Sequence, residues 1–199
     1  LREVPCIDLE LIAPVKQQIL YSKSFGRPIK DLDIMKNTIS YYATEAYRKM
    51  RNQQLKTFDV GVFVSTNPFN KNRKQYQRSS YTKFPLSTCY LPEILLATKK
   101  IIEKIFIPKY EYKKAGVFFL ELEKEKDDHF ALFESVNQSE EKKERLMSAF
   151  DSINQKYGRG SICLASSGFG KPWKMKQEKL SRRFTTNWNE ILVVNAPKS

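Results

Sequence analysis

The sequence VKQQILYSKSFG, at residues 15–26, has the alternation of a β-strand. Its side chains fall on two sides of an extended chain, which separates Ile19 and Tyr21 from Leu20, Ser22 and Ser24. Lysines lie near both ends of the stretch. The pattern has two interpretations: an ordinary sheet strand with solvated lysines, or a strand that presents amides, hydroxyls and cations to a phosphate backbone.

Downstream, hydrophobic periodicity predicts two helices and three further strands. Arg27-Pro28 is expected to end the first strand, and Asp33 to be the N-cap of a helix over residues 34–51. A second helix is expected over residues 92–107. The three strands are expected at residues 58–66, 81–87 and 113–122. The last of them is predicted to be central, because it is apolar on both faces.

Strand, helix, strand, strand, helix, strand is the order of the split βαβ arrangement, so the sequence predicts an α+β fold. A four-stranded sheet would carry both helices on one face and leave the other face free for a ligand. Residues 15–123 are therefore expected to form one domain, after a linker over residues 1–14. The opening LREVPC lacks a methionine and predicts a piece of a longer protein.

The net charge of +13 is unevenly distributed along the chain. Residues 14–120 carry +13, residues 121–150 carry −4, residues 151–199 carry +6 and residues 1–13 carry −2. A basic domain favours a polyanion as partner, and nucleic acid over a membrane surface, since no apolar run or amphipathic anchor is visible. Three scattered cysteines and a single histidine argue against a disulfide framework or a zinc site and for a reducing cytosol.

After the last strand comes an acidic connector, expected over residues 124–138, which contains the apolar segment HFALF at residues 129–133. Its carboxylates are interpreted as a solvated linker, since a metal site needs converging ligands. HFALF either folds back onto a domain or forms an anchor peptide that inserts apolar side chains into a partner.

A tail domain, expected over residues 139–199, is predicted to be a small α/β unit. It would open with a helix capped by Ser139 and ended by Gly158, with acids in the first turn. Residues 159–168 are expected to add a short strand. The remaining tail has Trp173, Phe184 and Trp188 among basic residues.

Several of these segments resemble Y-family (lesion-bypass) DNA polymerases of the UmuC type. The first strand fits the pattern P-x-K-Q-x-I-x-x-S-[KR]-S-F-G of their little-finger domain, and YKKAGV at residues 112–117 and GRG at 158–160 also match. The tail fits the pattern W-x-M-x-x-x-x-L-S-x-R-[FY]-T-T through Trp173, Met175, Leu180, Ser181, Arg183, Phe184, Thr185 and Thr186. The resemblance covers essentially the whole chain.

This resemblance implies a little-finger domain that grips primer–template DNA. The candidate contacts combine the first strand with the basic stretch KNRKQYQRSS at residues 71–80, whose other interpretation is a solvated hairpin connection. They are Lys16, Ser22, Lys23, Ser24, Arg27, Lys71, Arg73, Lys74 and Arg78. HFALF lies where the family carries a Q-L-x-L-F-like peptide that docks on the replicative sliding clamp. The clamp contacts would be His129, in place of the usual glutamine, with Phe130, Leu132 and Phe133.

The same resemblance implies the wider setting: error-prone translesion synthesis in DNA repair and the SOS response, in a bacterial cytoplasm and at the nucleoid. A UmuD-type subunit and a recombinase filament are further implied partners of the tail. The palm carboxylates that hold Mg²⁺ in such polymerases lie upstream of this region, so the piece is expected to bind no cofactor and to incorporate no nucleotide. Two alternatives are a free-standing nucleic-acid-binding module and a protein-interaction adaptor.

Overall fold

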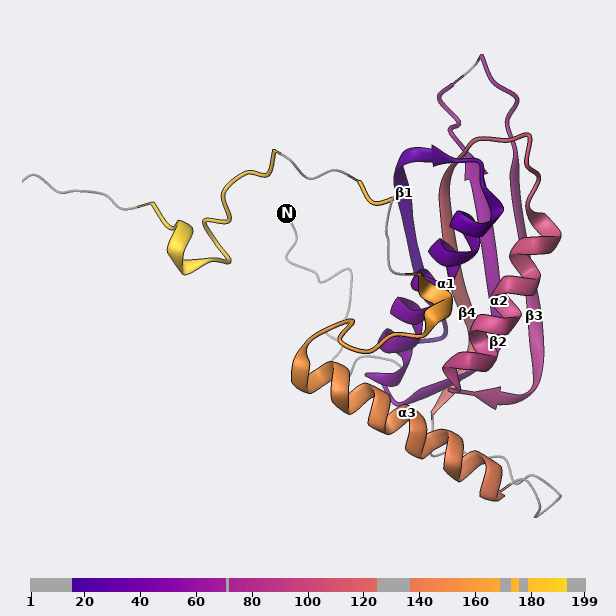
Figure 1. The fold of residues 1–199 in the computed structure, drawn as a ribbon, viewed down its shortest axis with the longest axis vertical. Helices are drawn as coiled ribbons and strands as arrows, with labels where there is room; N and C mark the ends of the chain where they lie inside the picture. Colours follow the sequence, from indigo (N-terminus) through magenta and orange to yellow (C-terminus); the bar gives the residue numbers. More distant parts are fainter. Residues whose placement is uncertain (1–15, 71, 125–136, 169–172, 176–178, 193–199) are drawn as a thin grey trace, which may run out of the picture.

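A computed structural model of the chain describes residues 16–70, 72–124, 137–168, 173–175 and 179–192. The elements follow one another as in Figure 1. They are β1 (Ile19–Ile29), α1 (Leu32–Arg51), β2 (Leu55–Thr66), β3 (Gln77–Thr88), α2 (Leu91–Ile105), β4 (Tyr112–Lys124) and α3 (Asn137–Tyr157), with short 3₁₀ turns at Ala165–Ser167 and Trp188–Glu190.

The four strands form one antiparallel sheet in the order β1-β4-β2-β3. Strand β4 lies between β1 and β2, and β2 lies between β3 and β4, so each βαβ unit is split by a strand from the other unit. The predicted α+β fold is confirmed. The prediction that residues 113–122 form a central strand is also confirmed, because β4 pairs on both sides.

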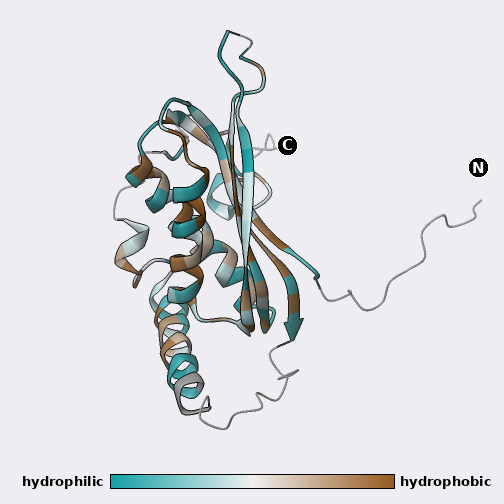
Figure 2. Cartoon of the chain, turned by 90° about the vertical axis from the view of Figure 1, so that its right-hand side faces the viewer, coloured by the Kyte–Doolittle hydropathy of each residue, from teal (hydrophilic) through white to brown (hydrophobic). Residues whose placement is uncertain are grey.

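Helices α1 and α2 cover one face of the sheet, and no described helix covers the other face (Figure 2). Val60, Val62 and Val64 of β2 point into the helix-covered layer and are fully buried. They meet residues such as Met35 and Ile39 of α1, which are buried to the same degree. Because strand side chains alternate, the residues between these valines point to the opposite, uncovered face.

Helix α3 contacts the C-terminal part of α1 through side chains. Arg51 of α1 is only 13% exposed and pairs with Glu144 at 2.6 Å and with Asp151 at 3.0 Å. Met147, between these two acids on α3, is buried as part of the same core cluster. Burial alone would lower the pKa of the Arg51 guanidinium, but its hydrogen bonds to Glu144 and Asp151 raise it. The guanidinium therefore stays charged.

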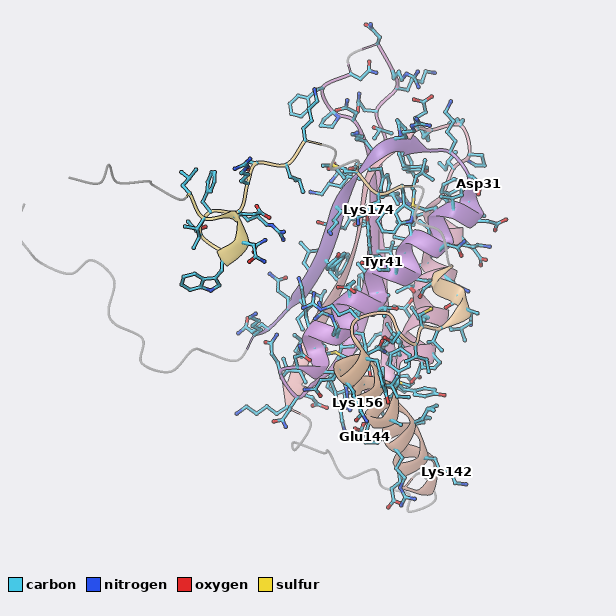
Figure 3. All side chains as sticks on the ribbon, turned by 60° about the vertical axis from the view of Figure 1, so that its left-hand side comes forward. Asp31, Tyr41, Lys142, Glu144, Lys156 and Lys174 are labelled. Carbon is cyan, nitrogen blue, oxygen red and sulfur yellow. The ribbon has the colours of Figure 1, made fainter. Side chains whose placement is uncertain are left out.

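A short strap at residues 173–175 ties the C-terminal region to β1. The Trp173 ring centroid lies 5.2 Å from the ring centroids of both Tyr41 and Tyr42 on α1. Tyr41 and the strap residue Lys174 are labelled in Figure 3. Its carbonyl accepts a hydrogen bond from the Gly26 N–H at 3.1 Å. A Cβ on Gly26 would lie 2.9 Å from the Lys174 carbonyl oxygen, so the strap approaches β1 where only glycine leaves room. The predicted division of the chain at residues 123 and 138 stays a prediction.

Two local predictions about the ends of elements in the sheet domain are wrong. Strand β1 continues through Arg27 and Pro28, with a register irregularity after Ser24. An edge strand tolerates proline because its outer N–H has no partner to lose. The N-cap of α1 is Asp31 rather than Asp33: the Asp31 carboxylate accepts a 2.8 Å hydrogen bond from the Ile34 N–H.

The C-terminal region departs from expectation in the same way. Helix α3 begins at Asn137, so Ser139 lies inside it and is not its cap. The described residues 159–168 form turns and a 3₁₀ helix instead of the expected strand. Gly158 and Gly160 adopt positive φ, and the Asn154 side chain accepts hydrogen bonds from the Gly160 and Ile162 N–H groups. These contacts curl the chain back on α3.

Candidate nucleic-acid interface

The uncovered side of the sheet, called here the open face, is organised in rows that cross all four strands. In one row, Tyr81 of β3 pairs with Gly61 of β2, which pairs with Phe118 of β4, which pairs with Leu20 of β1. The next row runs through Ser79, Phe63, Gly116 and Ser22 in the same strand order. The open face therefore has aromatic residues at its centre and serine hydroxyls beside them.

The two phenylalanines at the centre lie over glycines of the neighbouring strand. A Cβ on Gly61 would lie 2.1 Å from the ring of Phe118, and a Cβ on Gly116 would lie 2.3 Å from the ring of Phe63. Both positions require glycine, because the ring already occupies the space of a side chain. Such cross-strand pairing of an aromatic ring with glycine also fixes the register of β2 against β4.

The predicted contacts on β1 divide between the two sides of the sheet. Ser22 and Ser24 pair with Gly116 and Lys114, and they belong to the open face. Lys23 lies on the helix-covered side, where its Nζ is 5.5 Å from the ring of Tyr21. The two remaining cations, Lys16 before β1 and Arg27 within it, are exposed.

At one end of the sheet, the connections around β2, β3 and β4 gather a set of cations, called here the cation cluster: Lys30, Arg73, Lys74, Lys109 and Lys113. Glu111 lies among them, with one carboxylate oxygen 2.5 Å from Lys30 Nζ and the other paired with Arg73. Four of these cations line a hollow of about 420 Å³ with Glu111. Five cations around one carboxylate leave an excess of positive charge suited to phosphate.

The cation cluster unites two predicted contacts with three residues that the sequence did not single out. Arg73 and Lys74 were predicted, whereas Lys30, Lys109 and Lys113 come from loops and a strand end far away in the sequence. The sequence signal that could have found Lys30, Lys109 and Lys113 is their position at or near the ends of elements that meet at the same end of the sheet. Arg78 is exposed on β3, away from the residues that line this hollow. Lys71 lies outside the described residues.

Some charged side chains near the open face are already paired. Lys83 of β3 contacts Glu121 of β4 at 2.6 Å, and this hydrogen bond raises the pKa of Lys83. Lys114 is exposed, and its Nζ lies 6.0 Å from the ring of Phe63. Positive charge is therefore concentrated at the end of the sheet, and the centre of the open face is aromatic.

The predicted clamp contacts His129, Phe130, Leu132 and Phe133 lie outside the described residues. Within the described ranges, no group of three or more His, Cys, Asp and Glu side chains could hold a metal ion. No helix in the described part of the chain is long and apolar enough to cross a membrane.

Comparison with known proteins finds two family models that match separate stretches of the chain. Residues 16–132 match the impB/mucB/samB family C-terminal domain. The chain belongs to the impB/mucB/samB family. Residues 144–194 match a second family, described as a domain of unknown function (DUF4113). The family match thus contains the sheet, both covering helices and residues 129–132 of the HFALF segment, and the second match begins within α3.

Individual relatives support the family assignment. Over 194 residues, the chain is 33% identical to Protein UmuC of Salmonella typhimurium, covering 98% of this chain and 46% of the relative. It is 34% identical over 186 residues to Protein ImpB of Salmonella typhimurium, covering 94% of this chain and 43% of the relative. The chain therefore spans about half the length of these relatives.

Among solved structures, the little-finger domain of PolIV in complex with the β-clamp processivity factor is similar at 11% identity and a TM-score of 0.41. The match covers 58% of this chain and 97% of that domain.

Proposed function

We propose that this chain is the C-terminal region of an error-prone translesion DNA polymerase of the UmuC type, and that it holds primer–template DNA beside a catalytic part located elsewhere. Membership of the impB/mucB/samB family supports this proposal. The observation that carries it is the cation cluster, five basic side chains around Glu111 at one end of a sheet whose open face has no described helix over it. Phosphates are bound there without regard to sequence.

Neutralising the cation cluster tests this role. Arg73→Gln with Lys74→Gln should weaken the binding of every primer–template sequence alike and lower the slope of log affinity against log salt by about two. Fluorescence anisotropy of a labelled primer–template duplex gives both quantities. The matched control is Lys100→Gln with Lys104→Gln, which removes the same charge from exposed positions of α2 on the helix-covered side.

Two results would contradict the proposal. One is an equal loss of affinity in the control pair, which would mean that only the total charge matters. The other is binding that is absent at low salt or flat between about 50 and 200 mM salt, since phosphate contacts release counterions.

The HFALF segment is proposed to tether the polymerase to the replicative sliding clamp through Phe130, Leu132 and Phe133, with His129 at the polar end of the contact. Its support is the position of these three apolar side chains in an acidic connector. Leu132→Ala with Phe133→Ala should abolish clamp binding, measured by surface plasmon resonance on an immobilised clamp, and leave DNA affinity nearly unchanged. Loss of both activities together would show instead that the segment belongs to the fold.

The proposal extends to the setting of such a polymerase. In it, the tail meets a UmuD-type subunit and a recombinase filament during the SOS response, in the bacterial cytoplasm at the nucleoid. The catalytic Mg²⁺ ions belong to carboxylates outside this region, so the chain by itself is expected to incorporate no nucleotide. A primer-extension assay with and without the complete polymerase tests this expectation.

A further inference from the structure

Beyond the end of α3, the chain turns back to α1 and encloses a pocket. The loop over residues 158–168 leaves α3 and reaches the 3₁₀ turn beside α1, where Ser167 Oγ lies 3.5 Å from Thr44 Oγ1 (Figure 1). Between this loop, α1 and α3 lies a pocket of about 750 Å³, called here the α1–α3 pocket. None of the described cations proposed for DNA contact lines it.

The loop that closes the pocket is held at both ends. Gly158 and Gly160 have φ of +99° and +85°, and Gly168 has φ of +66°, which glycine adopts without strain. The Asn154 amide of α3 donates to the Ile162 carbonyl at 3.1 Å and accepts from the Gly160 N–H at 3.0 Å. The GRG segment at residues 158–160 therefore forms part of a preformed wall.

The lining of the pocket combines apolar surface with an excess of positive charge. Phe150, Ile162 and the rings of Tyr41 and Tyr47 supply the apolar surface. The charged groups are three arginines and two carboxylates: Arg48, Arg51, Arg159, Glu45 and Asp151. Each carboxylate is paired, Asp151 with Arg51 at 3.0 Å and Glu45 with Arg48 at 3.1 Å. Arg159 is exposed, so the lining keeps one positive charge without a partner among these acids.

Arg48 also has hydrogen-bonding capacity to spare. Its Nη2 donates to Glu45, whereas its Nε–H has no hydrogen-bond partner in the described part of the chain. A guanidinium has five N–H donors in a planar fork that matches a carboxylate. Arg48 and Arg159 can therefore take one further carboxylate. A run of phosphates would instead meet Glu45 and Asp151, which repel it.

We propose that the α1–α3 pocket binds an acidic segment of a partner protein. An apolar side chain of that segment packs against Phe150 and Ile162, and a neighbouring carboxylate pairs with Arg48 and Arg159. The volume is in the range of pockets that enclose a small ligand, and the surplus charge of one favours a single carboxylate over a polyanion. This inference goes beyond the proposed function, because the pocket and the cation cluster share no residue.

The test uses a blocked dipeptide, acetyl-Asp-Phe-amide, as the probe. In a nuclear magnetic resonance titration of the full ¹⁵N-labelled chain, the Nε–H resonances of Arg48 and Arg159 should shift and reach saturation, with a Kd below about 1 mM. Acetyl-Asn-Phe-amide has the same shape without the charge, and acetyl-Asp-Ala-amide lacks the ring. Each should bind at least about fivefold more weakly.

Two variants test the arginines. Arg159→Gln removes the exposed charge, and Arg48→Lys keeps a charge beside Glu45 but loses the planar fork; each should weaken acetyl-Asp-Phe-amide by at least about threefold. Arg145→Gln, on α3 but outside the pocket lining, is the matched control and should bind as the unaltered chain does. Because Arg159 is exposed, its variant keeps the test decisive if Arg48→Lys does not fold.

Three results would overturn the inference. Equal affinity for the Asp and Asn dipeptides would show that the pocket does not recognise a carboxylate. Unchanged affinity in both arginine variants would place the dipeptide elsewhere. Displacement by an equal concentration of inorganic phosphate would make the pocket a general anion site. The affinity of the same samples for primer–template DNA is measured in parallel, so that a failure here is distinguished from a failure of the proposed function.

Discussion

The sheet domain and the C-terminal region obtain their order in different ways. In residues 19–124, all four strands and both helices contribute buried side chains to one core. In the described residues from 141 on, the buried side chains are Met147, Ser167 and Trp173. Trp173 packs on α1, Ser167 lies 3.5 Å from Thr44 of α1, and Met147 shares the core of the sheet domain. The buried side chains in the described part of the C-terminal region therefore pack on the sheet domain.

The outermost described segment, residues 179–192, depends on local contacts. Glu190 accepts hydrogen bonds from the Arg183 N–H at 2.5 Å, from the Arg183 guanidinium and from the Asn187 amide. Trp188 is 90% exposed. Within the second family match, the described residues 144–168 and 173–175 contact α1 and β1, whereas residues 179–192 are held by contacts with one another.

The largest expected effect is in the core of the sheet. Phe119→Ala on the central strand β4 removes a fully buried ring and should lower the free energy of unfolding by about 3–5 kcal/mol. Phe184→Ala, at a position 44% exposed, is the control and should change it by less than about 0.5 kcal/mol. Chemical denaturation followed by circular dichroism measures both, and equal losses would contradict the comparison.

A smaller and more local effect is expected at the strap. Trp173→Ala removes the ring that packs on Tyr41 and Tyr42, at a cost of about 2–4 kcal/mol to the attachment of the C-terminal region. Hydrogen exchange should then show faster exchange in α3 and the strap, with β2 and β4 nearly unchanged. Arg145→Gln, which breaks only an exposed pair with Glu141, is the matched control. If β4 loses protection as much as α3, the two regions form one cooperative unit.

The smallest effect concerns the contacts of Glu190. The hydrogen bond from the Arg183 N–H lowers the pKa of this carboxyl, with further lowering from the Arg183 side chain. A carboxyl whose pKa is lower in the folded state stabilises that state above the unfolded value of about 4.3, and the contribution is lost as pH falls through the lowered pKa. The amide resonance of Arg183 should therefore shift in this acidic range, while resonances of β4 stay unchanged. In Glu190→Gln the same resonance should not titrate, and an unchanged titration would show that another group is responsible.

Local sequence patterns were sufficient for the elements of the sheet domain and their order. Valines at every second position of β2 and the three-four spacing in α1 specify strand and helix over a few residues, so the split βαβ fold could be predicted. The ends of elements were harder. Asp31 and Asp33 are both good caps by residue type, and only the backbone conformation places Asp31 at the N-cap.

The sequence by itself determined the fold class, the basic character of the sheet domain and the family resemblance, because these depend on periodicity, composition and short motifs. Only the tertiary structure decided which residues share a surface. It placed Phe118 over Gly61 and gathered Lys30, Arg73 and Lys109 around Glu111. Strand register sets these neighbours, and register results from the packing of the whole sheet rather than from any one segment.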